Sequence, residues 1–333
     1  MAMSLCLACG LTPAVATTAN QSDATSGAAH SKLPKLVLAG PAAVVSYPLL
    51  HMMESGALSD YADEVTFRLW QNNDQLRVLL TKHEIDYSAT PSNLPALMSN
   101  RGDPVKLLNI SVWGILWLVS SDPTVHSFKD LAGKELLMPF QRDLPAVLLD
   151  TLLNAQQEQD GLAPVKFRHT RDAQDAIALM LTGKGENALL VEPTASLLLW
   201  RAQQHEGPAL HRGQSLETAW REQFPTKAEL PQAGIIANSK FSDNDELNQA
   251  VERAYAESAR WCKNNAQSCA ELVHRHIPQL PVEPVKEAIE GTRLESRTAI
   301  EARPQLETLY GLVAEHFPES IGGKLPADSL YGP

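Results

Sequence analysis

Two matched stretches of the chain constrain its fold most strongly. The first begins with Phe128-Lys129-Asp130-Leu131-Ala132-Gly133-Lys134 and continues through a short apolar strand and a polar turn into an apolar helix that reaches Leu153. The second, Asn187-Ala188-Leu189-Leu190-Val191-Glu192-Pro193-Thr194, again runs from a strand through a turn into a helix. In open α/β sheets, ligands collect at the carboxyl ends of strands, where helix N-termini present free N–H groups. Two such ends predict a ligand cleft.

The remaining sequence extends this pattern into two successive α/β blocks. In the first block, periodicity predicts strands over residues 35–39, 65–70, 85–89 and, in two pieces, 106–119, with helices over 44–56, 73–81 and from 94. In the second, it predicts strands over residues 135–140, 165–169, 188–191, 209–212 and 234–237, with helices over 145–156, 173–181 and 194–203. From Asp243 onward the pattern is almost entirely helical. This order predicts parallel sheets covered by helices.

Charge and motif content exclude several functional classes. The 333-residue chain carries a net charge of −11, which argues against nucleic acid or an anionic membrane as partner but not against a small anion. The sequence has no phosphate-binding loop, dinucleotide fingerprint or nucleophile elbow. His274 and His276 are two residues apart and would diverge on a helix. We therefore expect no metal and no cofactor.

The N-terminus has the features of an export signal. Residues 1–16 carry no charged side chain, and Ala14-Val15-Ala16 fits a small-x-small cleavage site before a polar, disordered linker over residues 17–34. A basic start is missing, so a disordered cytosolic tail is the alternative. Cys9 follows Leu7-Ala8 as in a lipoprotein, but Cys6 departs from that pattern. No later apolar run reaches the roughly 20 residues of a membrane helix, so a periplasmic protein is expected.

These motifs resemble those of ABC-importer solute-binding proteins, nearest to the nitrate, sulfonate, taurine and thiamine-precursor binding group. The resemblance rests on the turn Asp130–Lys134, on Glu192-Pro193 and on the tail Pro318–Pro326, and it covers roughly residues 35–330. It implies a periplasmic-binding-protein fold of type II, with a ligand cleft between two lobes. Lobe one would comprise residues 35–119 and 238–333, lobe two residues 123–233, with crossings near Ser120-Ser121 and Ala233–Ala237.

The strand ends of lobe one offer polar and aromatic candidates for ligand contact. Pro41 closes the first strand, Ser46 could donate a hydrogen bond and Tyr47 could stack on a planar ligand, or both could serve the lobe itself. Trp70 and Trp113 could cover a ligand or belong to the core. The further candidates, Ser92 and Asn93, could equally cap the next helix.

The strand ends of lobe two add charged candidates. Arg142 has a guanidinium suited to a carboxylate, sulfonate or phosphate, unless it is a solvated surface residue. Asp143 is expected to cap the following helix. Glu192 could accept from a ligand N–H, hold Arg142, or only complement a helix dipole, and Thr194 follows it in the same turn.

Three functions are compatible with this pattern. The resemblance implies a monomeric binding protein without catalysis that delivers a small-molecule ligand to the permease subunits of an importer. The alternatives are an enzyme of the thiamine-precursor-synthase type and a ligand-sensing partner of a signalling receptor. The turns at the predicted cleft carry no lysine or histidine, which disfavours the enzyme. Aromatic candidates and Arg142 suggest an organic acid, a sulfonate or a heteroaromatic ligand, and no motif identifies it.

A disulfide between Cys262 and Cys269 is expected if the chain turns between them. Asn264-Asn265 is predicted to end one helix and Gln267-Ser268 to begin the next. Such a turn could bring the Cβ atoms to the roughly 3.8 Å that a disulfide needs. An unbroken helix would hold the Cα atoms about 10.5 Å apart, too far to bridge. Export to an oxidising compartment favours the bond.

Overall fold

The structure is a computed structural model that describes Met1 and residues 32–333, except for residues 142, 205–206 and 228. The predicted export signal, Cys6, Cys9 and most of the predicted linker therefore lie outside the described residues. Among the described residues, no helix combines the length and the apolar character that crossing a membrane requires.

Lobe one is built on a six-stranded sheet in the order β11-β4-β10-β3-β1-β2. The strands β1 (Leu36–Gly40), β2 (Val65–Leu69) and β3 (Tyr87–Pro91) are parallel. The strand β10 (Ala233–Ala237) lies antiparallel between β3 and β4 (Lys106–Val112). Its five residues are all buried, as expected for a short apolar run in the centre of a sheet.

Lobe two is built on a five-stranded sheet in the order β7-β6-β8-β5-β9. Here β6 (Glu135–Met138) is parallel to β7 (Lys166–His169) and to β8 (Asn187–Val191). The strand β5 (Leu116–Ser120) is antiparallel to β8 and to β9 (His211–Ser215). Both sheets are therefore mixed, whereas the order of elements predicted parallel sheets.

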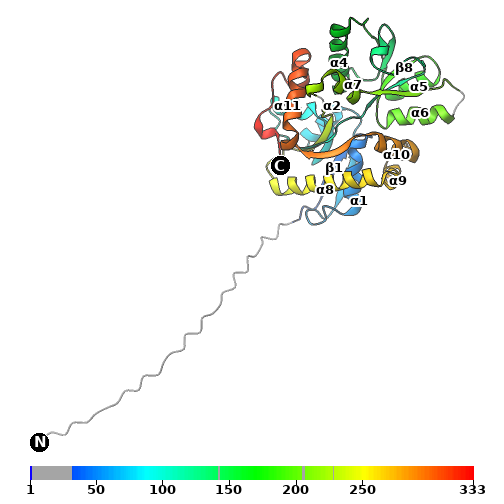
Figure 1. Cartoon of the computed structure of the whole chain (residues 1–333). Helices are drawn as coiled ribbons and strands as arrows, with labels where there is room; N and C mark the ends of the chain where they lie inside the picture. Colours follow the sequence, from blue (N-terminus) through cyan, green and yellow to red (C-terminus); the bar gives the residue numbers. More distant parts are fainter. Residues whose placement is uncertain (2–31, 142, 205–206, 228) are drawn as a thin grey trace. The chain divides into compact units, whose positions relative to one another are not determined.

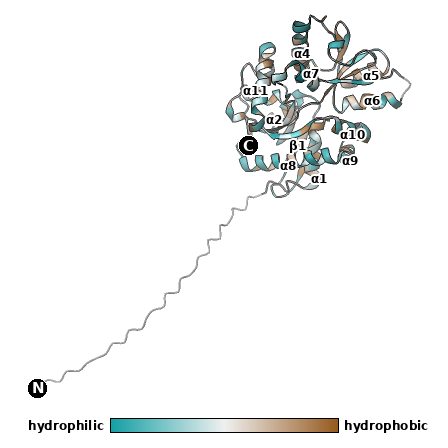
Figure 2. Cartoon of the chain, in the orientation of Figure 1, coloured by the Kyte–Doolittle hydropathy of each residue, from teal (hydrophilic) through white to brown (hydrophobic). Residues whose placement is uncertain are grey.

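Helices cover both sheets (Figure 1). In that view, α1, α8 and α9 lie together below β1, and α4 to α7 lie around β8. Figure 2 shows mainly hydrophilic residues along the visible side of α8. The helices are α1 (Tyr47–Ser55), α2 (Asn73–Thr81), α3 (Asn93–Asn100), α4 (Leu144–Asp160), α5 (Ala173–Leu181), α6 (Thr194–Gln204), α7 (Leu216–Gln223), α8 (Asp245–Asn264), α9 (Ala266–His276), α10 (Val282–Gly291) and α11 (Ala299–His316). Short 3₁₀ helices are η1 (Val44–Ser46), η2 (Lys129–Leu131), η3 (Pro225–Lys227), η4 (Pro318–Ile321) and η5 (Asp328–Leu330).

The two sheets flanked by helices confirm the predicted fold class, but the first crossing between the lobes lies earlier than expected. Strand pairing places β5 in the second sheet, so the chain crosses at Trp113–Ile115 and not at Ser120-Ser121. The apolar run continues across this crossing, and hydropathy therefore does not mark the change of sheet. A Cβ atom at Gly114 would lie 2.2 Å from Glu217 Oε2 and 3.0 Å from Glu217 Cβ, so a larger residue at this crossing would displace the Glu217 side chain.

The second crossing precedes β10, which pairs with β3 and β4 in the first sheet. One further strand, β11 (Leu294–Thr298), occurs in the region that the sequence predicts as almost entirely helical. It pairs antiparallel with β4 at the edge of the first sheet. Only one of its five residues is buried, so its sequence shows neither an apolar run nor a clear alternation.

The structure joins Cys262 and Cys269 in a disulfide, with 5.1 Å between their Cα atoms. The chain turns at Asn265, where α8 ends and α9 begins, as the sequence predicts. Both cysteines are fully buried. The bond therefore fixes the angle between two helices that pack against α1.

Replacing both cysteines with serine should lower the free energy of unfolding by about 2–3 kcal/mol, because the cross-link restricts a short loop in the unfolded chain. Urea unfolding of the oxidised protein and the double variant measures this difference. The control is the oxidised protein treated with reductant, which should show the same loss. Peptide mapping that finds both thiols free in protein unfolded without reductant would contradict the prediction.

Candidate functional site

A cavity of about 680 Å³ lies where the strand ends of the two sheets face each other. Pro41 follows β1, Trp70 follows β2, and Thr90 and Pro91 end β3. From lobe two, the cavity is lined by residues at the ends of β6, β7 and β8, namely Pro139, Phe140, Arg171, Asp172 and Val191. The cavity therefore occupies the carboxyl ends of parallel strands, where the sequence predicts a ligand cleft.

Three helix N-termini also border the cavity, those of α2, α4 and α5. At two of them a side chain caps the helix: Asn72 accepts a hydrogen bond from Gln75 N–H at 2.9 Å, and Asp172 accepts one from Asp175 N–H at 2.8 Å. The N–H groups that these caps leave free place partial positive charge at the edge of the cavity, where the carboxylates of Asp143 and Asp172 also lie.

A hydrogen bond joins the two lobes beside the cavity. Asn73 Nδ2, at the start of α2, donates to Asp143 Oδ1, just before α4, at 2.8 Å. Asp143 occupies the N-cap position of α4, but its side chain makes no capping hydrogen bond, so the predicted cap is corrected to a contact between lobes. Burial raises the pKa of Asp143 above its ordinary value, and the hydrogen bond from Asn73 opposes this shift.

Of the candidates in lobe one, Pro41 and Trp70 line the cavity. Trp70 lines the cavity and also belongs to the hydrophobic core, because its indole is 6% exposed and donates to Ser88 Oγ at 3.1 Å. Ser46 and Tyr47 are fully buried and are not among the lining residues. Their hydroxyl groups have no hydrogen-bond partner, and burial raises the pKa of Tyr47 well above its ordinary value, with a further contribution from the charge of Glu192.

Trp113 lies at the first crossing and is not among the residues that line the cavity. Its indole nitrogen donates to the carbonyl of Glu295 at 2.8 Å, and the guanidinium of Arg297 lies 4.3 Å from the ring centroid. The side chain is fully buried. Trp113 therefore packs against β11 and belongs to the core, which was one of its two predicted roles.

Ser92 and Asn93, at the start of α3, do not line the cavity and do not cap the helix. Ser92 Oγ donates to the carbonyl of Pro231 at 2.7 Å, and Asn93 Nδ2 donates to that of Ser320 at 3.0 Å. These bonds tie α3 to the second crossing and to the C-terminal tail. Pro91, which precedes Ser92, and Gln232, which follows Pro231, both line the cavity, so the Ser92 bond joins two segments of its wall.

Glu192 pairs with Arg212 of β9, a residue that the sequence analysis did not single out. Arg212 also donates at 2.8 Å to Ser196 Oγ and to Glu287 of α10. Burial raises the pKa of Glu192, and the charge of Arg212 opposes this rise. Glu192 and Thr194 are not among the lining residues. Arg142, its predicted alternative partner, lies outside the described residues.

Gln232 lines the cavity and was missed by sequence reasoning. Its side chain is buried, and neither its amide oxygen nor its amide nitrogen has a hydrogen-bond partner. The sequence analysis followed the ends of parallel strands, whereas Gln232 precedes an antiparallel strand. The signal available was its position just before the apolar run Ala233–Ala237, where the second crossing was expected.

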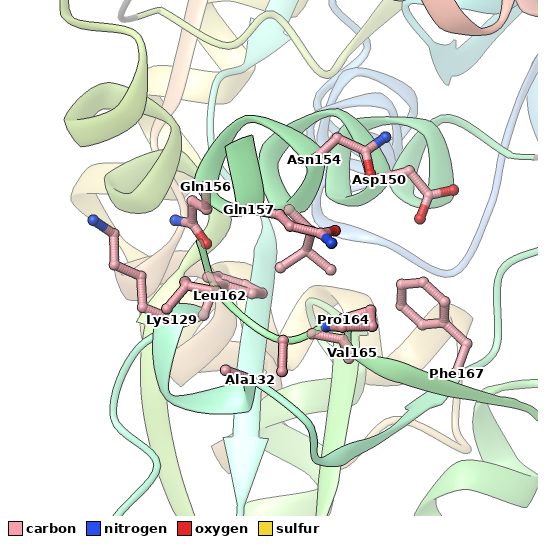
Figure 3. Close-up of a pocket in the computed structure, with 13 residues that line it drawn as sticks. Lys129, Ala132, Asp150, Asn154, Gln156, Gln157, Leu162, Pro164, Val165 and Phe167 are labelled. Carbon is pink, nitrogen blue, oxygen red and sulfur yellow. The ribbon is translucent and has the colours of Figure 1, made fainter. Parts of the chain in front are cut away.

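A second, smaller cavity of about 80 Å³ lies in lobe two (Figure 3). Side chains of α4, including Asn154 and Gln157, line one side, and the segment that leads to Phe167 of β7 lines the other. The volume holds only a few water molecules. It has no lining residue in common with the larger cavity.

The described residues that line the large cavity are mainly apolar and include no serine, cysteine, histidine or lysine. Thr90 is the hydroxyl-bearing residue among them, and its hydroxyl donates to the carbonyl of Pro91 at 3.3 Å. Within the described ranges, no group of three or more His, Cys, Asp or Glu side chains is placed to hold a metal ion.

The fold is that of the two-lobed solute-binding proteins of ABC importers. The structure of an ABC transporter protein from Parabacteroides distasonis superposes with a TM-score of 0.74 at 19% identity, covering 90% of this chain and 99% of that one. The periplasmic aliphatic sulphonate binding protein SsuA from Escherichia coli gives 0.67 at 14% identity, covering 90% and 92%. The periplasmic nitrate-binding protein NrtA from Synechocystis PCC 6803 gives 0.63 at 14% identity, covering 89% and 83%.

These structural neighbours come from the sulfonate and nitrate group that the sequence motifs resemble. No protein-family model matches the chain, and no curated protein matches its sequence. At identities of 14–19%, the comparison establishes the fold of this chain. The similarity covers 83–99% of the length of these three neighbours.

Proposed function

We propose that the chain is an extracytoplasmic solute-binding protein that captures a small ligand between its lobes and delivers it to the permease subunits of an ABC importer. One observation carries the proposal: the cavity of about 680 Å³ is shared by both lobes and its described lining offers no nucleophile–base pair. The proposal includes export by the N-terminal segment, a periplasmic location and a monomeric state.

The ligand we propose is small and organic, with a polar edge and an apolar or planar body. The lining supports this class, because Trp70, Phe140 and several aliphatic side chains lie beside polar side chains such as Asn72, Gln174 and Gln232. An acidic group on the ligand would lie near the helix N-termini, where Arg142 remains our proposed partner. The lining favours an organic ligand over a bare inorganic anion, because much of its apolar surface would otherwise stay unmatched.

Ligand binding should close the two lobes without chemical change. Contacts from both lobes favour the closed state, because only a difference in affinity between two states shifts their equilibrium. A thermal-shift screen of sulfonates, aromatic acids, pyrimidines and amino acids first identifies a ligand. Small-angle scattering should then show a smaller radius of gyration at saturation. An unchanged radius would contradict closure, and conversion of the ligand to a product would contradict the proposed function.

Trp70 should report this binding by fluorescence. Because its ring lines the cavity, ligand binding should change its emission, and Trp70→Phe should remove most of the ligand-dependent change. Trp113→Phe is the matched control, since this buried indole does not line the cavity. Loss of the signal in the Trp113 variant and its retention in the Trp70 variant would place the ligand elsewhere.

A further inference from the structure

Gln232 is held rigidly at the second crossing between the lobes. Its backbone N–H donates to the carbonyl of Val112 at 2.9 Å, and its own carbonyl accepts from Ser92 N–H at 2.9 Å. These two bonds fix the main chain on both sides, immediately before β10. The adjacent Pro231 accepts the bond from Ser92 Oγ at 2.7 Å. The side chain of Gln232 therefore starts from a fixed position on the cavity wall.

The amide of Gln232 has nothing to bind within the described protein. The side chain is 4% exposed, both of its polar atoms lack a hydrogen-bond partner, and it lines the cavity. Buried polar groups nearly always have partners, and leaving one without a partner is unfavourable. No other described lining residue supplies a partner in this structure. The residues next to Gln232 in the chain, Pro231 and Ala233, and Pro91, which pairs with Ala233, have no side-chain donor or acceptor.

We propose that Gln232 determines specificity by pairing with a ligand edge that carries a hydrogen-bond donor next to an acceptor. Lactams, carboxamides and amino-substituted nitrogen heterocycles present such an edge, and the primary amide can match it with one donated and one accepted bond. This inference rests on the proposed function and narrows its ligand class. A sulfonate or nitrate offers acceptors alone, so it would leave the Gln232 oxygen without a partner.

A matched pair of probes tests this role. 2-Pyridone carries adjacent N–H and C=O groups, and N-methyl-2-pyridone keeps the ring and the carbonyl but lacks the donor. Ligand-observed NMR should show the native protein binding 2-pyridone about tenfold or more tightly than its N-methyl derivative. Gln232→Met keeps the side-chain length, and this variant should bind the two pyridones with about equal affinity. Gln232→Leu is the second variant if Gln232→Met folds poorly.

The control is Gln267→Leu on α9, outside the cavity, which should keep the full preference. Equal affinity of the native protein for the two pyridones, or an unchanged preference in Gln232→Met, would overturn the role of Gln232. Absence of binding by either pyridone would overturn it as well. Benzenesulfonate tests the proposed function independently of Gln232. If it binds and compacts the protein while the two pyridones bind with equal affinity, the solute-binding function stands and the specificity role of Gln232 is wrong.

Discussion

Replacing Arg212 with alanine should lower the free energy of unfolding by about 3–5 kcal/mol, the usual cost of leaving a buried charge without its partner. The Glu192 side chain is fully buried, and its carboxylate pairs with Arg212 while accepting from Ser196 N–H at 3.1 Å. The same guanidinium reaches Glu287 on α10, so the variant also loses a contact of β9 with a C-terminal helix. Urea unfolding measures the loss.

The loss should depend on pH in a defined direction. Without Arg212, burial raises the pKa of Glu192 further above that of the unfolded chain. The folded variant then binds a proton more tightly than the unfolded one, so the deficit is largest at high pH and shrinks as pH falls. We expect a smaller difference between variant and native protein at about pH 5 than at about pH 8.

Arg68→Ala is the matched control, because Arg68, on the edge strand β2, forms an exposed pair with Glu84. Exposed pairs of this kind contribute about 1 kcal/mol or less. Equal costs for the two arginine variants would show that the Arg212 pair is not the buried, essential contact described above. A loss that stays constant between the two pH values would show that Glu192 does not take up a proton.

Local signals in the sequence predicted most helices and strands. The helices Asn73–Thr81 and Ala173–Leu181 have the predicted bounds because Asn72 and Asp172 cap their first turns and apolar periodicity defines their length. The position of the cavity was also predictable, since carboxyl ends of parallel strands meet at one edge of a sheet. The bounds of these helices depend on residues close together in the sequence, and the cavity position follows from the order of strands and helices along the chain.

Contacts between distant residues explain what sequence reasoning missed. From the sequence, Trp113 could cover a ligand or belong to the core. Its packing against Arg297 of β11, which lies far away along the chain, places it in the core. Glu192 follows β8, and Arg212 lies in β9. Both strands pair with β5, and this order of strands in the sheet brings the two side chains together. Gln232 reaches the cavity because β10 is inserted antiparallel between β3 and β4, which no periodicity in its five apolar residues indicates.

That insertion makes Gly234 a second position with a large expected effect. A Cβ atom at Gly234 would lie 1.8 Å from the backbone oxygen of Asn109 in β4. The two strands approach this closely at a register shift, where Asn109 Oδ1 accepts from Ile235 N–H at 3.1 Å. Because the obstacle is backbone in the middle of a sheet, it cannot turn aside as a side chain would, and β10 would have to separate from β4.

Gly234→Ala should therefore lower the free energy of unfolding by about 3 kcal/mol, at the upper end of the cost of overpacking. Gly311→Ala is the matched control, because this exposed glycine lies within α11 with nothing within 4 Å of the added Cβ. The control should stabilise the protein by about 0.5–1 kcal/mol, the gain expected for alanine in a helix.

Since β10 follows directly from Gln232, the displacement of β10 in Gly234→Ala should also weaken ligand binding. Urea unfolding and calorimetry on both variants test the two effects, and a stable Gly234→Ala protein with native affinity would mean that β10 and β4 are not paired as the structure shows.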